Sequence, residues 1–259
     1  MNRTKIETVL NPDGTQGYTW NPITGCTNHT AGQCKGGGFP CYAYILAHGR
    51  LEAKYNTIVK DGESVITNGD PFYPRYWPER VEQLQREYGT GKGKRRGVFA
   101  CDMSDLFGLH VPSTWTDAAI GAMEECEYWR FYLLTKQPQR LQEFSPFPSN
   151  CWVGVTVTRQ QFLKPALEAL AGVEAGKRYI YFEPLLEHII VAGHQLRAAR
   201  VDWVIVGAQT QPTKRPELLW VEDIIAPASI AGSKVWLKKT LLPLFPASNG
   251  QLAKEIPHD

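Results

Sequence analysis

The chain has 259 residues, and 28 lysines and arginines against 26 aspartates and glutamates give it a net charge of +2. At roughly 150 residues per domain this is one large domain or two small ones. Its 43% hydrophobic and 21% charged residues are close to the globular average, which excludes a disordered, fibrous or collagen-like chain. No run approaches the roughly 18 apolar residues of a membrane span. Because residues 1–7 lack an apolar signal region, we expect a cytoplasmic protein with no membrane partner.

The first predicted element is an N-terminal hairpin. Pro-Asp-Gly at 12–14 is a turn signal, and the second arm of the hairpin is predicted at 17–20. A first barrel strand near 18–23 then leads into a glycine-rich loop. Helices are expected at 41–55 and at 77–88, the second with Pro78 in its first turn.

Short apolar runs rich in β-branched and aromatic residues follow. They predict buried strands at 97–101, 131–135, 152–157, 179–183, 202–207 and 234–238. The strand starts lie 21 to 34 residues apart, which is typical of βα units, and helices are predicted at 114–126, 160–171 and 217–226.

This pattern predicts an α/β fold. We expect a single domain over 1–259 that forms a partial TIM-type barrel of about six or seven parallel strands, preceded by the hairpin. A doubly wound open sheet is the alternative, because the sequence does not determine strand order.

Three of the six cysteines, Cys26, Cys34 and Cys41, lie in the loop 24–43 with the spacing C-x7-C-x6-C. Without a secretory signal, clustered cysteines indicate metal ligands before disulfides. Three thiolates suit an iron–sulfur cubane with one open iron that can chelate a small molecule. Zinc with His29 as a fourth ligand is an alternative, although structural zinc sites usually have short C-x2-4-C pairs. Unligated loop thiols are the remaining alternative.

The other three cysteines, Cys101, Cys126 and Cys151, are scattered singly beside apolar segments. Buried packing is the commonest role of such residues. Cys101 differs from the other two because it borders a polar strand end.

Polar residues follow most of the predicted strands. In parallel α/β folds the ligand site lies at the carboxyl ends of the strands, so these residues together predict a site, although each alone is equally explained by the start of a loop. They are Asp102, Ser104, Asp105, Thr135, Lys136, Thr156, Thr158, Glu183, Gln209 and Lys238.

Two basic segments are candidate nucleic-acid contacts. Lys92–Arg96 lacks interleaved aromatic residues, which favours a solvated loop over a phosphate-binding one. Arg75, Trp77 and Arg80 form an aromatic–basic patch that could stack a base, but Trp77 is equally explained as a core anchor.

A series of short motifs runs through nearly the whole chain. They are TWNPITGC (19–26), CYA (41–43), WPER (77–80), DMSDLF (102–107), LTKQP (134–138), WVGVTV (152–157), FEPLL (182–186), WVIVG (203–207) and KRP (214–216). With these motifs the chain resembles a family of phage-associated proteins, also found in bacteria and archaea. That family is classed as radical-SAM-like and is related in its cysteine motif to the spore photoproduct lyase branch.

The resemblance implies a cofactor pair. A 4Fe–4S cluster would be held by Cys26, Cys34 and Cys41, with S-adenosylmethionine (SAM) at the open iron. Asp102, Met103, Ser104 and Asp105 stand where the family holds the SAM amino group. Lys136 would pair with the SAM carboxylate, Thr135 and Thr156 would hydrogen-bond SAM, and Gly207 and Ala208 would lie against the adenine. Glu183 and Lys238 are the predicted catalytic residues, with Lys239 also facing an anionic substrate.

The predicted function is therefore that of a radical SAM enzyme, which cleaves SAM reductively to a 5′-deoxyadenosyl radical. Its substrate is unknown, with a nucleic acid or nucleotide as a candidate, and its partners include an electron donor such as flavodoxin or ferredoxin. The alternative is a non-catalytic iron–sulfur or zinc module that binds nucleic acid or a phage protein. A cofactor-free barrel enzyme is the third hypothesis.

Overall fold

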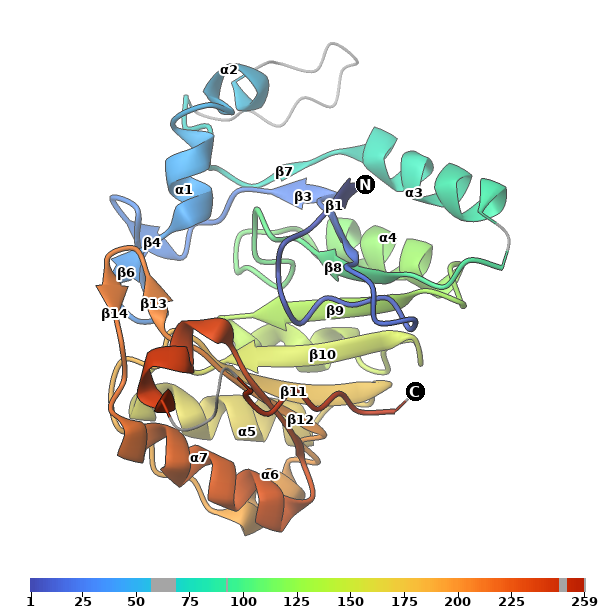
Figure 1. The fold of residues 1–259 in the computed structure, drawn as a ribbon. Coiled ribbons are helices and arrows are strands. Elements are labelled where there is room, and N and C mark those ends of the chain that lie inside the picture. Colours follow the sequence, from blue (N-terminus) through green and yellow to red (C-terminus); the bar gives the residue numbers. More distant parts are fainter. Residues whose placement is uncertain (57–68, 92, 247–250, 259) are drawn as a thin grey trace. The chain divides into compact units, whose positions relative to one another are not determined.

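A computed structural model describes residues 1–56, 69–91, 93–246 and 251–258. The chain divides into two compact units, Met1–Gln137 and Pro138–Asp259, and each contains parallel strand pairs (Figure 1). The predicted α/β class is confirmed, whereas closure into a barrel and a single domain over 1–259 stay predictions. Within the described residues, the helices are all too short or too polar to cross a bilayer.

In the first unit the strand order is β1 (Asn2–Arg3), β2 (Tyr18–Trp20), β8 (Gly97–Ala100) and β9 (Arg130–Thr135). β1 and β2 are antiparallel, and a bridge between Leu10 and Gln16 extends this N-terminal hairpin. The pairs β2–β8 and β8–β9 are parallel. The strand predicted near 18–23 is shorter than expected, because β3 (Ile23–Thr24) leaves this sheet and pairs with β7 (Arg75–Tyr76).

The described part of the first unit contains four α-helices: α1 (Tyr42–Ala47), α2 (Glu52–Tyr55), α3 (Pro78–Thr90) and α4 (Ser113–Glu124). The prediction of one helix over 41–55 is wrong. The chain turns after Ala47, where Gly49 N–H bonds to Leu46 O, and glycine is a weak helix former. The helix predicted over 77–88 is confirmed as α3, which begins one residue later, at Pro78, and ends at Thr90. α4 has Pro112 at its N-cap, without a side-chain cap from Ser113 or Thr114.

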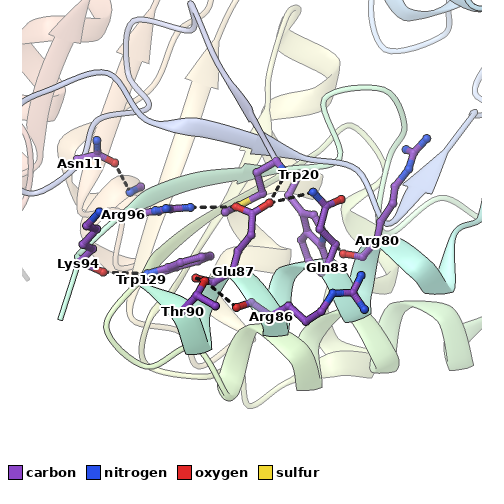
Figure 2. A network of polar contacts seen from close by, with 12 residues as sticks. Asn11, Trp20, Arg80, Gln83, Arg86, Glu87, Thr90, Lys94, Arg96 and Trp129 are labelled. Atoms are coloured by element: carbon purple, nitrogen blue, oxygen red, sulfur yellow. Dashed lines mark hydrogen bonds and ion pairs between the residues drawn. The ribbon is translucent and has the colours of Figure 1, made fainter. Parts of the chain in front are cut away.

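A polar network attaches α3 to the strands of the first unit (Figure 2). Glu87 of α3 accepts hydrogen bonds from Arg96 Nη1 at 3.1 Å and from Gln83 Nε2 at 2.9 Å. The Arg96 guanidinium also lies 4.8 Å from the ring centre of Trp129, whose Nε1 donates to Lys94 O at 2.9 Å. Arg96 is therefore engaged inside the unit, which agrees with a structural role for part of the basic stretch. Lys92 of the same stretch lies outside the described residues.

The main sheet of the second unit has four parallel strands in its described residues, in the order β10 (Cys151–Thr156), β11 (Lys177–Phe182), β12 (Trp203–Val206) and β15 (Lys234–Leu237). The predicted strands at these places are confirmed. Every residue of β10 and β12 is buried, as the continuous apolar runs indicate for strands covered on both faces. Trp152 and Trp203 meet edge to face at 5.9 Å in this core.

Besides these four strands, the described residues of the second unit form α-helices, 3₁₀ helices (η) and one short hairpin, β13–β14. They are η1 (Pro138–Phe144), η2 (Gln160–Phe162), α5 (Leu163–Ala171), α6 (Gly193–Ala198), β13 (Gln209–Thr210), β14 (Thr213–Lys214), α7 (Leu218–Ala231) and η3 (Lys239–Leu244). α5 packs on β10, and α7 packs on β15 and α6 (Figure 1). α7 runs five residues beyond the predicted end at 226, through Pro227, and stops where Gly232 adopts a φ of 84°.

Candidate metal centre

The cysteine loop of the first unit contains a small antiparallel sheet that the sequence reasoning missed. Its strands are β4 (His29–Thr30), β5 (Gln33–Cys34) and β6 (Phe39–Pro40), and Cys34 pairs with Phe39. Gly32 turns the chain with a φ of 78°, and its carbonyl accepts a hydrogen bond from Cys41 N at 2.9 Å. Backbone hydrogen bonds therefore fix the conformation of the cysteine loop.

Cys26, Cys34 and Cys41 are all free thiols in this loop, with Cys34 buried and the other two half-buried. The three thiols lie close enough to interact electrostatically. Cys34 and Cys41 each contribute to the raised pKa of Cys26, and Cys41 contributes to that of Cys34. Burial raises the pKa of Cys26 to about 12, and the Asp105 carboxylate adds to this shift. Burial also raises the pKa of Cys34, where the nearby Lys136 ammonium acts in the opposite direction.

A 4Fe–4S cluster and a single zinc ion require different spacings of their protein ligands. Among the described residues, no group of three or more His, Cys, Asp or Glu side chains lies close enough together to hold a metal ion. Zinc draws its ligands to about 2.0–2.3 Å from a single centre. In a cubane each thiolate binds a different iron, so the ligands stand farther apart. His29, the fourth ligand of the zinc alternative, instead accepts a hydrogen bond from Gly32 N at its Nδ1 atom, at 3.3 Å.

Backbone groups of the loop face the sulfurs. Asn28 N–H donates to Cys26 Sγ at 3.3 Å, and Gly36 N–H bonds to Cys34 and opposes the rise in its pKa that burial causes. A Cβ atom on Gly36 would lie 2.8 Å from Lys136 Cδ, so the glycine lets the lysine stem lie against the loop. The predicted SAM residue Lys136 is thus placed beside the predicted ligand Cys34.

Asp105 accepts hydrogen bonds from several of the residues that follow β8 and β9. Its carboxylate accepts hydrogen bonds from Thr135 Oγ1 at 2.7 Å and from the backbone N–H groups of Phe107 and Lys136 at 3.1 and 3.0 Å. Gln137 Nε2 is a further donor at 3.4 Å. Asp105 and Thr135, both predicted as SAM residues, are therefore brought together and bound to each other.

The predicted residues Asp102, Met103 and Ser104 border the start of the cysteine loop. Asn21 donates from Nδ2 to Asp102 Oδ1 at 2.5 Å and accepts from Met103 N at 3.0 Å. Ser104 Oγ donates to Ile23 O at 2.9 Å. Burial raises the pKa of Asp102, and the bond from Asn21 opposes this shift. The sequence reasoning missed the bridging role of Asn21, although the residue lies within the quoted motif TWNPITGC.

In the second unit the predicted residues Glu183, Gly207 and Lys238 meet at the carboxyl ends of β11, β12 and β15. Lys238 Nζ lies 2.7 Å from Glu183 Oε2, with only 14% and 17% of the two side chains exposed. A Cβ atom on Gly207 would lie 2.5 Å from Glu183 Oε1, so only glycine leaves room for the carboxylate. Ala208 N–H donates to Thr240 Oγ1 at 3.0 Å, and Lys239 begins η3.

Thr156, at the end of β10, differs from these residues. Its Oγ1 is buried and has no hydrogen-bond partner among the described residues. A buried hydroxyl without a partner is costly, so this atom is a candidate for a bond to a ligand.

The remaining candidates have packing roles. Cys101, Cys126 and Cys151 are buried, as predicted, and burial raises the pKa of Cys101 to about 12. Arg75 and Arg80 flank the buried ring of Trp77 at 5.2 and 4.2 Å from its centre. This buried stack favours the core-anchor interpretation of Trp77 over contact with a base.

The family model described as "Protein of unknown function (DUF5131)" matches residues 14–240, and the chain belongs to this family. No curated protein matches the chain.

Among solved structures, the chain is similar to a spore photoproduct lyase double mutant with bound AdoMet and dinucleoside spore photoproduct, at 15% identity and a TM-score of 0.46. It is also similar to spore photoproduct lyase complexed with dinucleoside spore photoproduct, at 14% identity and a TM-score of 0.46. The two matches cover 85% and 80% of this chain, which spans 63% and 59% of those chains.

Proposed function

We propose that the chain binds a 4Fe–4S cluster through Cys26, Cys34 and Cys41 and uses it in radical SAM chemistry. The observation that carries the proposal is the presence of three free, mutually interacting thiols on one hydrogen-bonded loop. A cluster with three protein ligands leaves one iron open, and reduction of SAM bound there supplies a 5′-deoxyadenosyl radical. An electron donor such as flavodoxin or ferredoxin is part of the proposal.

In this proposal, residues of the first unit stabilise the thiolate form of the cysteine ligands. The Lys136 ammonium favours the thiolate of Cys34, and Asn28 N–H donates to Cys26. Asp105 holds the segment 135–137 through its side chain, and Asp102, Met103 and Ser104 remain candidates for the SAM amino group.

The residues of the second unit are proposed to act on SAM or on substrate. Glu183 and Lys238 form a mostly buried ion pair that can exchange its partners for a polar ligand. Thr156 Oγ1 is a hydroxyl ready to bond such a ligand, and Gly207 and Ala208 keep their proposed place beside the adenine. A nucleic acid or nucleotide remains the candidate substrate.

The deciding experiment is anaerobic reconstitution with iron and sulfide. The wild-type chain should take up about four irons and show charge-transfer absorption, and the Cys26→Ala, Cys34→Ala and Cys41→Ala variants should each lose most of this iron. Cys126→Ala, which removes a buried cysteine outside the loop, is the matched control and should retain it. Zinc in place of iron, or no metal in the wild-type chain, would refute the proposal.

A second measurement tests the chemistry separately from the cluster. The cluster-loaded chain is reduced with dithionite in the presence of SAM, and 5′-deoxyadenosine is measured by chromatography. Its appearance in the wild-type sample supports a radical SAM enzyme. Its absence from a fully loaded sample would leave only an iron–sulfur binding protein.

A further inference from the structure

Gln137 ends the first unit and was not among the predicted site residues. The residue is 5% exposed, and its amide is oriented by Leu109, whose backbone N–H donates to Oε1 at 3.2 Å. Since an N–H group can only donate, the other amide atom must be Nε2. This nitrogen lies 3.4 Å from Asp105 Oδ2 and 4.0 Å from Cys26 Sγ.

The two acceptors that face Gln137 Nε2 repel each other when both are charged. The Asp105 carboxylate and the sulfur of a Cys26 thiolate both carry negative charge, and both lie against this one nitrogen. An amide NH₂ group carries two protons and no net charge, so it can donate one proton to each acceptor. Hydrogen bonds to a charged acceptor are shorter and stronger, so the longer of these contacts is expected to tighten when Cys26 is a thiolate.

From this geometry we propose that Gln137 is a positioning residue for Cys26, and that its N–H···S contact raises the reduction potential of the bound cluster. The inference rests on the proposed function, because it needs a cluster on Cys26. Hydrogen bonds to cluster sulfurs are among the features that set such potentials, since they stabilise the more negative, reduced state. Asn28 supplies a second donor to the same sulfur through its backbone, whereas Gln137 can be removed by substitution.

The test uses the full chain, reconstituted with iron and sulfide, in two variants. Gln137→Met keeps the length of the side chain and removes the donor. Gln137→Glu keeps an acceptor for Leu109 and turns a second carboxylate oxygen toward Cys26 and Asp105. The cluster potential is measured by redox titration followed by electron paramagnetic resonance, with iron content and thermal unfolding measured in parallel.

Both variants should have more negative potentials than the wild type, and Gln137→Glu should show the larger shift. At the wild-type midpoint potential, the ratio of reduced to oxidised cluster should fall about tenfold for Gln137→Glu, which corresponds to 59 mV for one electron. Gln85→Glu adds the same charge at an exposed position of α3 and should leave the potential unchanged.

The outcomes separate this inference from the proposed function. A loaded wild type with unchanged potentials in both variants would overturn the role of Gln137 and leave the cluster proposal intact. A wild type that takes up no cluster would overturn both. If Gln137→Met does not fold, the potential of Gln137→Glu decides the question alone.

Discussion

The strand ends of the two units use their polar side chains differently. In the first unit, Asp105 and Thr135 are bonded to each other and to the neighbouring backbone, so these groups already have partners inside the chain. In the second unit, Thr156 Oγ1 is buried without a partner among the described residues. Glu183 and Lys238 form a mostly buried ion pair at the ends of β11 and β15, the two strands that flank β12.

The two kinds of polar group have different roles: one stabilises the fold, which we call bracing, and the other is available to bind a ligand. A saturated carboxylate such as Asp105 stabilises the segment that holds a site, because replacing it leaves several buried donors unpaired. A hydroxyl without a partner lowers the stability of the ligand-free protein and gains a hydrogen bond when a ligand arrives. The same position in a βα unit can therefore serve either purpose, and substitutions should tell the two apart.

The largest effect is expected at Asp105. Asp105→Ala removes the acceptor of Thr135 Oγ1 and of the Phe107 and Lys136 N–H groups, so we expect the free energy of unfolding to fall by about 3 kcal/mol or more. Urea denaturation of the metal-free chain measures this. Asp117→Ala, at an exposed position of α4, should change it by less than about 0.5 kcal/mol. Equal losses in the two variants would contradict the bracing role.

Gly207→Ala tests the ion pair of the second unit. The added Cβ would lie 2.5 Å from Glu183 Oε1, so Glu183 must move away from Lys238 or the strand must shift. Crowding of this kind costs about 1–3 kcal/mol, measured as a lower midpoint of thermal unfolding. Gly121→Ala is the control, because a Cβ there meets no atom within 4 Å and alanine favours the helix α4. An unchanged midpoint for Gly207→Ala would show that Glu183 adapts freely.

Two threonine substitutions contrast the units directly. Thr135→Val removes the bond to Asp105 and the acceptor of Gln137 N, and should lower the free energy of unfolding by about 1–2 kcal/mol. Thr156→Val removes a hydroxyl without a partner and should leave stability unchanged or raise it by up to about 1 kcal/mol. Both residues are at most 5% exposed, so burial is closely matched. Losses of the same size at both positions would remove the distinction between the units.

Asp102→Asn should have the smallest effect, and its sign depends on pH. Burial raises the pKa of Asp102, so the folded chain holds this proton more tightly than the unfolded chain. Ionisation of the group therefore lowers stability as the pH rises above about 4. Asparagine stays neutral and can still accept from Asn21, so its advantage over the wild type should be larger at pH 7 than at pH 4. Unfolding curves at both values check this, and an advantage that grows toward low pH would contradict it.

Much of the fold was predictable because its signal is local. Continuous apolar runs such as 152–157 identify buried parallel strands without knowledge of their neighbours, and Pro78 marks the start of α3. The helix predicted over 41–55 failed because its amphipathic pattern continues through Gly49, where the backbone turns. The short strands β4, β5 and β6 have two residues each, which is too few for any periodic signal.

The sequence by itself determined which residues carry the chemistry: three clustered cysteines, and polar groups at the ends of apolar runs. The tertiary structure decided which of these groups pair and which stay available. Asp105 meets Thr135 across 30 residues, Glu183 meets Lys238 across 55, and Gln137 reaches Cys26 across 111. Hydrogen bonds and ion pairs require contact in space, and parallel strands supply it for Asp105 with Thr135 and for Glu183 with Lys238 by bringing distant strand ends to the same edge of a sheet.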